Sequence, residues 1–193
     1  MLAGLSIAAL AHAGAFGHRA GSETWTEPAG IAGASRAETV TTQDYNGLQT
    51  IKLREYDKRP CVVELEESPF AIPSLALISP IKVCDNTGQE IWKRVDVGNG
   101  VFLNAISTCT TGVKGDSAIH GVEAWGVVLQ PDGKLTPRKG SEKMAFDGCK
   151  KWSAKKACPA GAVATGLRAD HDASSGVVGL SLRCHALEPR GKR

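Results

Sequence analysis

The sequence of 193 residues is short of aromatic side chains, which make up 5% of it, and it has no strong excess of charge of one sign. Its 23 basic and 20 acidic side chains leave a net charge of +3. Proteins that bind nucleic acid or an anionic membrane through their overall charge carry a larger excess, so we expect neither partner. The apolar content of 42% is near that of globular proteins and excludes a wholly disordered chain.

Several motifs of catalysis and cofactor binding are also missing. The sequence has no phosphate-binding G-x-x-x-x-G-K-[ST], no G-x-G-x-x-G after a strand and no G-x-S-x-G nucleophile elbow. It has no C-x-x-C, and its closest cysteines, Cys149 and Cys158, are nine residues apart. Zinc-binding pairs are typically about two to four residues apart. We therefore expect no cofactor and no metal, and the sequence favours a protein that is not an enzyme.

The cysteines and the N-terminus predict the compartment. An even number of cysteines is typical of disulfides in an exported protein; the six are Cys61, Cys84, Cys109, Cys149, Cys158 and Cys184. Residues 1–13 are apolar and end in Ala-His-Ala, a sequence of the kind that signal peptidase cleaves. This stretch is shorter than the about 20 residues that span a bilayer. We expect a signal peptide over residues 1–13 and a secreted, extracellular protein, periplasmic if bacterial.

The remaining chain divides at residue 48. Residues 14–47 are mainly Ala, Gly, Ser, Thr and Glu without periodicity, which predicts a flexible segment. Beyond it, short apolar runs alternate with turn residues. The clearest run, residues 178–184, puts four apolar side chains on one face of a strand. About nine such strands predict an all-β domain over residues 48–188, with a tail over 189–193.

Two segments bounded by cysteines predict an internal repeat. Residues 84–109 and 158–184 each begin with a cysteine and a glycine-containing turn, and each ends in a strand that closes with a cysteine. Residues 119–125 and 163–169 share a central glycine between apolar residues. A glycine at such a position permits a bulge or a close approach of a neighbouring backbone.

The second segment carries a family resemblance. It contains Cys158-Pro159-Ala160-Gly161, then Gly166-Leu167, and it ends in Gly179-Leu180-Ser181-Leu182-Arg183-Cys184. This pattern resembles the repeat of the vitelline membrane outer layer protein I family. The resemblance covers residues 158–184, whereas residues 84–109 match only in their cysteines and final strand and have Asp85 in place of the proline.

The resemblance implies a secreted β-prism, in which three Greek-key sheets pack about a pseudo-threefold axis. It also implies an extracellular-coat protein or one that interacts with carbohydrate. The fold expected is therefore all-β, β-prism-like with internal repeats and stabilised by disulfides; a β-sandwich is the alternative.

Disulfide pairing remains open for four of the cysteines. The resemblance implies that Cys158 pairs with Cys184. One set for the others pairs Cys61 with Cys84 and Cys109 with Cys149, whereas the repeat alone would pair Cys84 with Cys109 and Cys61 with Cys149.

Tryptophan and lysine residues are candidates for ligand binding. Tryptophan stacks on sugar rings, although it also fills the cores of β-domains. Trp152 lies in a lysine-rich stretch, so we expect it to be exposed, whereas Trp125 lies in an apolar run and is expected in the core. We take Trp152, Trp92, Lys151 and Lys155 as candidate ligand-binding residues, the lysines for anionic groups. The alternative to ligand binding is that the tryptophans only pack against other side chains and that the lysines belong to a solvated loop.

The triplet Asp170-His171-Asp172 has two interpretations. In a strand, Asp170 and Asp172 would share a face and could bind a ligand or form a carboxylate pair. The surrounding turn-forming residues instead predict a solvated loop. An extracellular hydrolase that uses these carboxylates with His120 or His171 is the alternative function.

The function that these observations favour is a secreted, non-catalytic binding module. Carbohydrate is the leading ligand class because of the family resemblance. A coat protein or a secreted inhibitor, whose partner is another protein, remains an alternative.

Overall fold

The computed structural model describes residues 16–31, 34–71, 76–85, 87–113 and 117–190. The regular secondary structure in these ranges consists of β-strands, and no helix there is long and apolar enough to cross a membrane. The expected signal peptide lies outside the described residues. The strands are β1 (Phe16–His18), β2 (Thr24–Trp25), β3 (Ala29–Gly30), β4 (Arg36–Thr41), β5 (Asn46–Tyr56), β6 (Arg59–Pro69), β7 (Ala76–Lys82), β8 (Glu90–Asp96), β9 (Val101–Thr110), β10 (Gly121–Leu129), β11 (Leu135–Pro137), β12 (Glu142–Ala145), β13 (Lys151–Trp152), β14 (Lys156–Ala157), β15 (Ala162–Asp172) and β16 (Gly176–Pro189).

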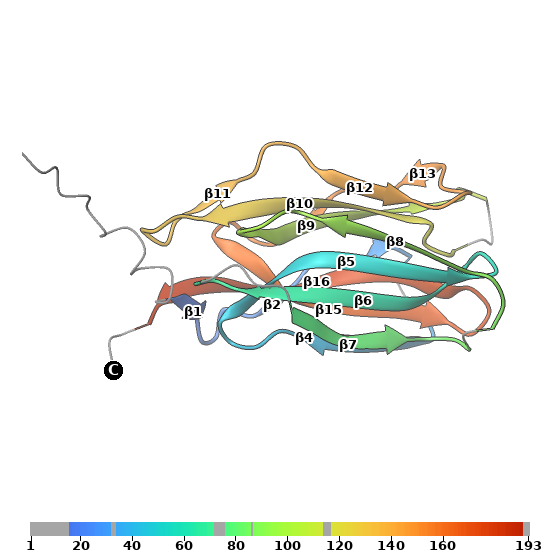
Figure 1. Ribbon diagram of the computed structural model, residues 1–193, viewed down its shortest axis with the longest axis horizontal. Coiled ribbons are helices and arrows are strands. Elements are labelled where there is room, and N and C mark those ends of the chain that lie inside the picture. Colours follow the sequence, from blue (N-terminus) through green and yellow to red (C-terminus); the bar gives the residue numbers. More distant parts are fainter. Residues whose placement is uncertain (1–15, 32–33, 72–75, 86, 114–116, 191–193) are drawn as a thin grey trace, which may run out of the picture.

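These strands form three sheets, and each sheet is built around one antiparallel hairpin. Sheet I has the order β7-β6-β5-β8. In sheet II, β11 and β12 pair with β10, and β13 and β14 pair with β9. In sheet III, β1, β2 and β3 pair with β16, and β4 pairs with β15. In Figure 1 the strands of sheet II lie at the top, and those of sheets I and III lie below them.

The three sheets repeat one Greek key. In each, the outer strands, taken in chain order, pair first with the second strand of the hairpin and then with its first strand. Sheet III draws these outer strands from the N-terminal end of the chain. Three Greek keys around one core make a β-prism, so the predicted fold class is confirmed and the alternative β-sandwich is wrong.

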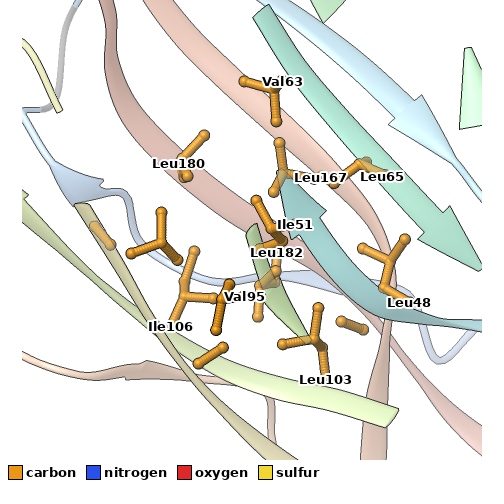
Figure 2. Packing of buried hydrophobic residues seen from close by; sticks show 14 of the residues in the cluster. Leu48, Ile51, Val63, Leu65, Val95, Leu103, Ile106, Leu167, Leu180 and Leu182 are labelled. Carbon is orange, nitrogen blue, oxygen red and sulfur yellow. The ribbon is translucent and has the colours of Figure 1, made fainter. Parts of the chain in front are cut away.

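The inner faces of the sheets meet in one apolar core. Figure 2 shows side chains from all three sheets pointing toward one another; those labelled are Leu48, Ile51, Val63, Leu65, Val95, Leu103, Ile106, Leu167, Leu180 and Leu182. The alternating residues of β16 supply Val178, Leu180, Leu182 and Cys184, all with 0% exposure, as the sequence pattern predicted. Burying one large aliphatic side chain stabilises the fold by roughly 2 kcal/mol.

The prediction of a flexible segment over residues 14–47 is wrong. Residues 16–41 contain β1 to β4, which complete sheet III, and β5 begins at Asn46. These strands escaped the sequence analysis because β2 and β4 lie at sheet edges with exposed side chains, so no apolar alternation marks them. Backbone pairing and a few anchors such as Phe16, 6% exposed, and Ala29, 0% exposed, hold the segment. The domain therefore begins by residue 16, and β16 carries it to residue 189.

Three disulfides tie the sheets, and all six cysteines are paired. The pairs are Cys61–Cys84 within sheet I, Cys109–Cys149 within sheet II, and Cys158–Cys184, which joins the end of sheet II to β16. This is the first of the two sets considered, and it includes the pair that the family resemblance implied.

The repeat units of the structure begin at different points in the chain from the repeat units predicted from the sequence. Cys109 lies in β9, the first strand of its hairpin, whereas Cys184 lies in β16, the second strand of its hairpin. Residues 119–125 and 163–169 are likewise in a second strand and a first strand. The structural repeats instead begin at the hairpins, because the hairpin is the unit that the Greek key repeats.

Two stacked histidines fasten the first strand to the last. The rings of His18 on β1 and His185 on β16 have centroids 4.8 Å apart and an interplanar angle of 12°. Nε2 of His18 lies 2.9 Å from the carbonyl oxygen of Asn46, and Nδ1 of His185 lies 2.7 Å from Oγ1 of Thr165. Burial lowers the pKa of His18, and burial followed by the nearby charge of His18 lowers the pKa of His185. The pair is therefore stable in its neutral form.

Acidification should destabilise this contact. Because both folded pKa values lie below the ordinary 6.5, the stability is fully present above pH 6.5 and is lost as the pH falls through the lowered values. We expect the free energy of unfolding, measured in urea between pH 8 and pH 5, to decrease below pH 6.5. His18→Phe keeps an aromatic ring that cannot be protonated and should flatten this dependence. If the free energy of unfolding of the His18→Phe variant depended on pH as steeply as that of the unmodified protein, the histidine pair would not be the cause of the pH dependence.

Phe16 provides a test of the N-terminal strands. Because its ring packs in a cluster with Phe70, Phe102 and Val127, Phe16→Ala should lower the free energy of unfolding by about 3 kcal/mol. Ile31→Ala is the matched control, since Ile31 follows β3 but is 45% exposed, and it should change stability by less than about 0.5 kcal/mol. Urea unfolding measures both, and a Phe16→Ala variant as stable as the control would mean that β1 contributes nothing.

Candidate functional site

A strip of aromatic and charged side chains covers the outer face of sheet II. Along β10, Val122 and Ala124 are fully buried, so Glu123 and Trp125, which alternate with them, face outward. The strip, which we call the tryptophan–lysine face, consists of Glu123, Trp125, Ser141, Lys143, Trp152 and Lys155.

Each tryptophan of this face has a lysine over its ring. Nζ of Lys143 lies 4.4 Å from the ring centre of Trp152, and Nζ of Lys155 lies 4.5 Å from that of Trp125. Glu123 lies between the two rings and forms an ion pair of 3.1 Å with Lys143. These cation–π contacts favour positions of the two ammonium groups over the rings.

The sequence predictions for the two tryptophans need correction. Trp152 is half-buried rather than exposed, because β13 pairs with β9 and carries the ring across Gly121. Trp125 is also half-buried and belongs to the surface rather than the core. The alternation of Val122 and Ala124 with Trp125 was a signal for this outward position that the sequence analysis missed.

The lysine-rich stretch is part of the sheet. Instead of a loop, it forms β13 and β14, which pair with the edge of β9. Lys150, Lys151 and Lys155 are exposed along this edge. The structure thus brings Trp152, Lys151 and Lys155 together on sheet II.

Trp92 lies apart from this group, on sheet I. Its side chain is 54% exposed, and Nζ of Lys52 lies 4.5 Å from its ring centre. The neighbouring charges are balanced, because Lys52 and Arg54 both form ion pairs with Glu64 and Arg54 forms another with Glu90.

The Asp170-His171-Asp172 triplet is not the solvated loop that was predicted. All three residues belong to β15, which carries a register shift between Asp170 and His171, and Asp170 and His171 are 2% and 4% exposed. Oδ1 of Asp170 accepts hydrogen bonds from Nε and an NH2 group of Arg168, at 2.9 and 2.8 Å. Burial of Asp170 is possible because this guanidinium compensates its charge.

Asp172 has a separate structural partner. Its Oδ1 accepts hydrogen bonds from the backbone N–H and the hydroxyl of Ser35, at 3.0 and 2.9 Å. These bonds lower the pKa of Asp172 and attach the end of β15 to the segment before β4. Among the described residues, neither Asp170 nor Asp172 has a hydrogen bond to a histidine, so the geometry does not assemble the hydrolase site that the sequence suggested.

A pocket that the sequence analysis missed lies at the hairpin end of sheet I. It has a volume of about 200 Å³ and is lined by Glu55, Asp57, Lys58, Gln89 and Ile91. Two segments distant in sequence form it: the end of β5 with the β5–β6 turn, and the start of β8. No single stretch of sequence could have predicted it.

Backbone geometry holds the two segments of the pocket together. Asp57 and Lys58 form a turn with φ values of 49° and 67°, in the left-handed region. The N–H of Gln89 donates to Oδ1 of Asp57 at 3.0 Å, and the N–H of Asp57 donates to the carbonyl of Gln89 at 3.2 Å. Gly88, with φ of 100°, allows this approach because a side chain there would collide with the Asp57 carboxylate.

A buried contact between Glu55 and His120 lies at one wall of the pocket. Glu55 is 3% exposed, and its Oε1 lies 3.0 Å from Nδ1 of His120. His120 is also buried and lies between β9 and β10 of sheet II. The contact fixes the orientation of the Glu55 carboxylate and links the pocket to sheet II.

The fold is the β-prism of jacalin-related lectins. Similar solved structures include Calystegia sepium agglutinin, at a TM-score of 0.52 and 12% identity, with 84% of this chain and 96% of that chain covered. The Calsepa lectin in complex with a biantennary N-glycan matches at 0.53 and 13%, with 85% and 97% covered. AcmJRL, a mannose-binding jacalin-related lectin from Ananas comosus, matches at 0.50 and 10%, with 86% and 99% covered.

These similarities establish a shared fold. No protein-family model and no curated protein matches the sequence. The chain spans nearly the whole length of the lectins to which it is similar.

Proposed function

We propose that this protein is a secreted, non-catalytic carbohydrate-binding module, and that the pocket at the hairpin end of sheet I binds one sugar residue. The observation that carries the proposal is the combination of groups in the pocket. The carboxylates of Glu55 and Asp57 can accept hydrogen bonds from hydroxyls, and Lys58 and Gln89 can donate them. Ile91, 46% exposed, supplies an apolar wall for the C–H face of a sugar ring.

The geometry of the pocket also supports binding rather than catalysis. Glu55 is held by His120, and Asp57 by the backbone of Gln89, so both carboxylates are fixed before a ligand arrives. Fixed polar groups reduce the entropy that binding costs.

The comparisons with known proteins support the ligand class. The Calsepa lectin is described with an N-glycan, and AcmJRL is described as mannose-binding. The resemblance of residues 158–184 to the vitelline membrane outer layer protein I repeat points to the same broad class. Relationship to that family is part of this proposal, as is an extracellular-coat role.

Secretion is the proposed localisation. Three disulfides are expected to persist in an oxidising compartment. The apolar residues 1–13 would provide the export signal.

Asp57→Asn tests the pocket. Asparagine tolerates the left-handed backbone of this turn and keeps an oxygen for the N–H of Gln89, so the change removes only the charge. We expect the chain from Gly14 to bind members of a glycan panel that contains mannosides and N-glycans. Calorimetry with the tightest binder should give a Kd about tenfold weaker for Asp57→Asn.

Asp132→Asn is the matched control. Oδ1 of Asp132 accepts a hydrogen bond of 3.0 Å from the N–H of Lys134, in an exposed turn of sheet II. This variant should keep the original Kd. Equal affinities for the Asp57→Asn variant and the unmodified chain would exclude the pocket as the site, and a glycan panel without any binder would overturn the function itself.

A further inference from the structure

We propose that the tryptophan–lysine face of sheet II, with the exposed lysines at its edge, binds acidic polysaccharide carrying sulfate or carboxylate groups. This surface belongs to a different sheet from the pocket, and the proposal does not depend on the pocket binding a sugar.

The first observation is the extended shape of the face. Trp152 lies against Gly121, whose added side chain would come within 3.2 Å of Cη2 of Trp152, and Trp125 lies four residues further along β10. Four residues of an antiparallel strand extend roughly 14 Å. A surface of this length suits a linear chain with several repeating units rather than a single small molecule.

The second observation is the excess of positive charge. Lys150, Lys151 and Lys155 are exposed, and no carboxylate of the described residues forms an ion pair with any of them. The one acidic group within the face, Glu123, is already bound by Lys143 and by the hydroxyl of Ser141. The edge of the face therefore presents three lysines that no carboxylate neutralises within the described part of the chain.

The outer face of sheet I provides the contrast. There, Lys52 and Arg54, next to the exposed tryptophan, are paired with Glu64 and Glu90, and Arg94 opposite Lys52 is an exposed cation without an ion pair among the described residues, whereas sheet II places three such lysines within residues 150–155. A ligand attracted by charge should therefore choose sheet II. The two sheets have the same topology, and only their side chains differ.

The third observation selects the class of anion. A single-stranded nucleic acid would stack its bases on open aromatic faces. Here lysine ammonium groups lie over both tryptophan rings, so the rings are less open to stacking. Several lysines spread along one face of the sheet suit anionic groups that recur along a polysaccharide. In addition, the low net charge of +3 argues against a nucleic-acid-binding protein.

The test compares two triple variants with the same loss of charge. One is Lys150→Gln/Lys151→Gln/Lys155→Gln on sheet II. The control is Arg36→Gln/Lys82→Gln/Arg94→Gln, which removes exposed cations from sheets III and I. Binding to heparin, polygalacturonate, neutral dextran and single-stranded DNA is measured by calorimetry in about 0.1 M salt, where distant charges are screened.

The unmodified chain should bind heparin or polygalacturonate but not dextran, and the affinity should fall as salt is added. The sheet II variant should lose about tenfold in affinity, whereas the control variant should lose less than about threefold. Equal losses in the two variants would show that only the net charge matters and would overturn the proposal. So would the absence of binding to both acidic polysaccharides, or tighter binding to DNA.

Two further measurements separate this surface from the pocket and from misfolding. Asp57→Asn should leave heparin and polygalacturonate binding unchanged, and a loss there would overturn the independence of the two surfaces. Urea unfolding should give both triple variants the midpoint of the unmodified chain, since all six side chains are exposed. If the sheet II variant unfolds earlier, Lys151→Gln alone, compared with Lys82→Gln alone, must reproduce the difference in affinity, and failure to do so overturns the proposal.

Discussion

The pairing of the N-terminal strands with the C-terminal hairpin is the constraint on which this fold depends. β16 is the longest strand, and its edge opposite β15 is covered by β1, β2 and β3, which begin the described chain. β4 covers the outer edge of β15 in the same way. Sheet III can therefore form only when both ends of the domain are present, whereas sheets I and II are each built from continuous stretches. Closure of sheet III completes the core, because Leu180 and Leu182 of β16 pack against residues of the other two sheets.

This closure explains which parts of the fold could be predicted from sequence. Strands with one buried face show alternation, and β16 was recognised by its four alternating apolar residues, all fully buried. β4 has no such pattern because its side chains are almost all exposed, and its position is set by backbone hydrogen bonds to β15. Residues 16–41 therefore looked like a linker although they complete a sheet. The start of the structural repeat was missed because the cysteines are not at equivalent positions: Cys61 and Cys184 lie in the second strand of their hairpins, whereas Cys109 lies in the first strand of its hairpin.

In the candidate site, too, positions set by neighbouring residues in the sequence can be predicted, whereas positions set by tertiary contacts cannot. Alternation with Val122 and Ala124 along β10 contained the information that Trp125 lies on the outer face, although the prediction put Trp125 in the core. Asp170 could not be placed, because its burial depends on an ion pair with Arg168 that compensates its charge. The pocket of sheet I depends on Gly88, which lets the β7–β8 connection approach the turn at Asp57. Nothing in the sequence around either residue predicts that approach.

The three sheets share a backbone plan but have different chemistry. Sheet I pairs Lys52 and Arg54 with glutamates and has the pocket at its hairpin end. Sheet II leaves several lysines unpaired among the described residues and lays two tryptophans across its strands. Sheet III buries ionisable groups in the stacked histidines and at Asp170, which is paired with Arg168. Because the core is shared, outward side chains can differ between the sheets without changing the packing. A threefold prism can therefore present two chemically unlike surfaces while its third sheet serves to close the fold.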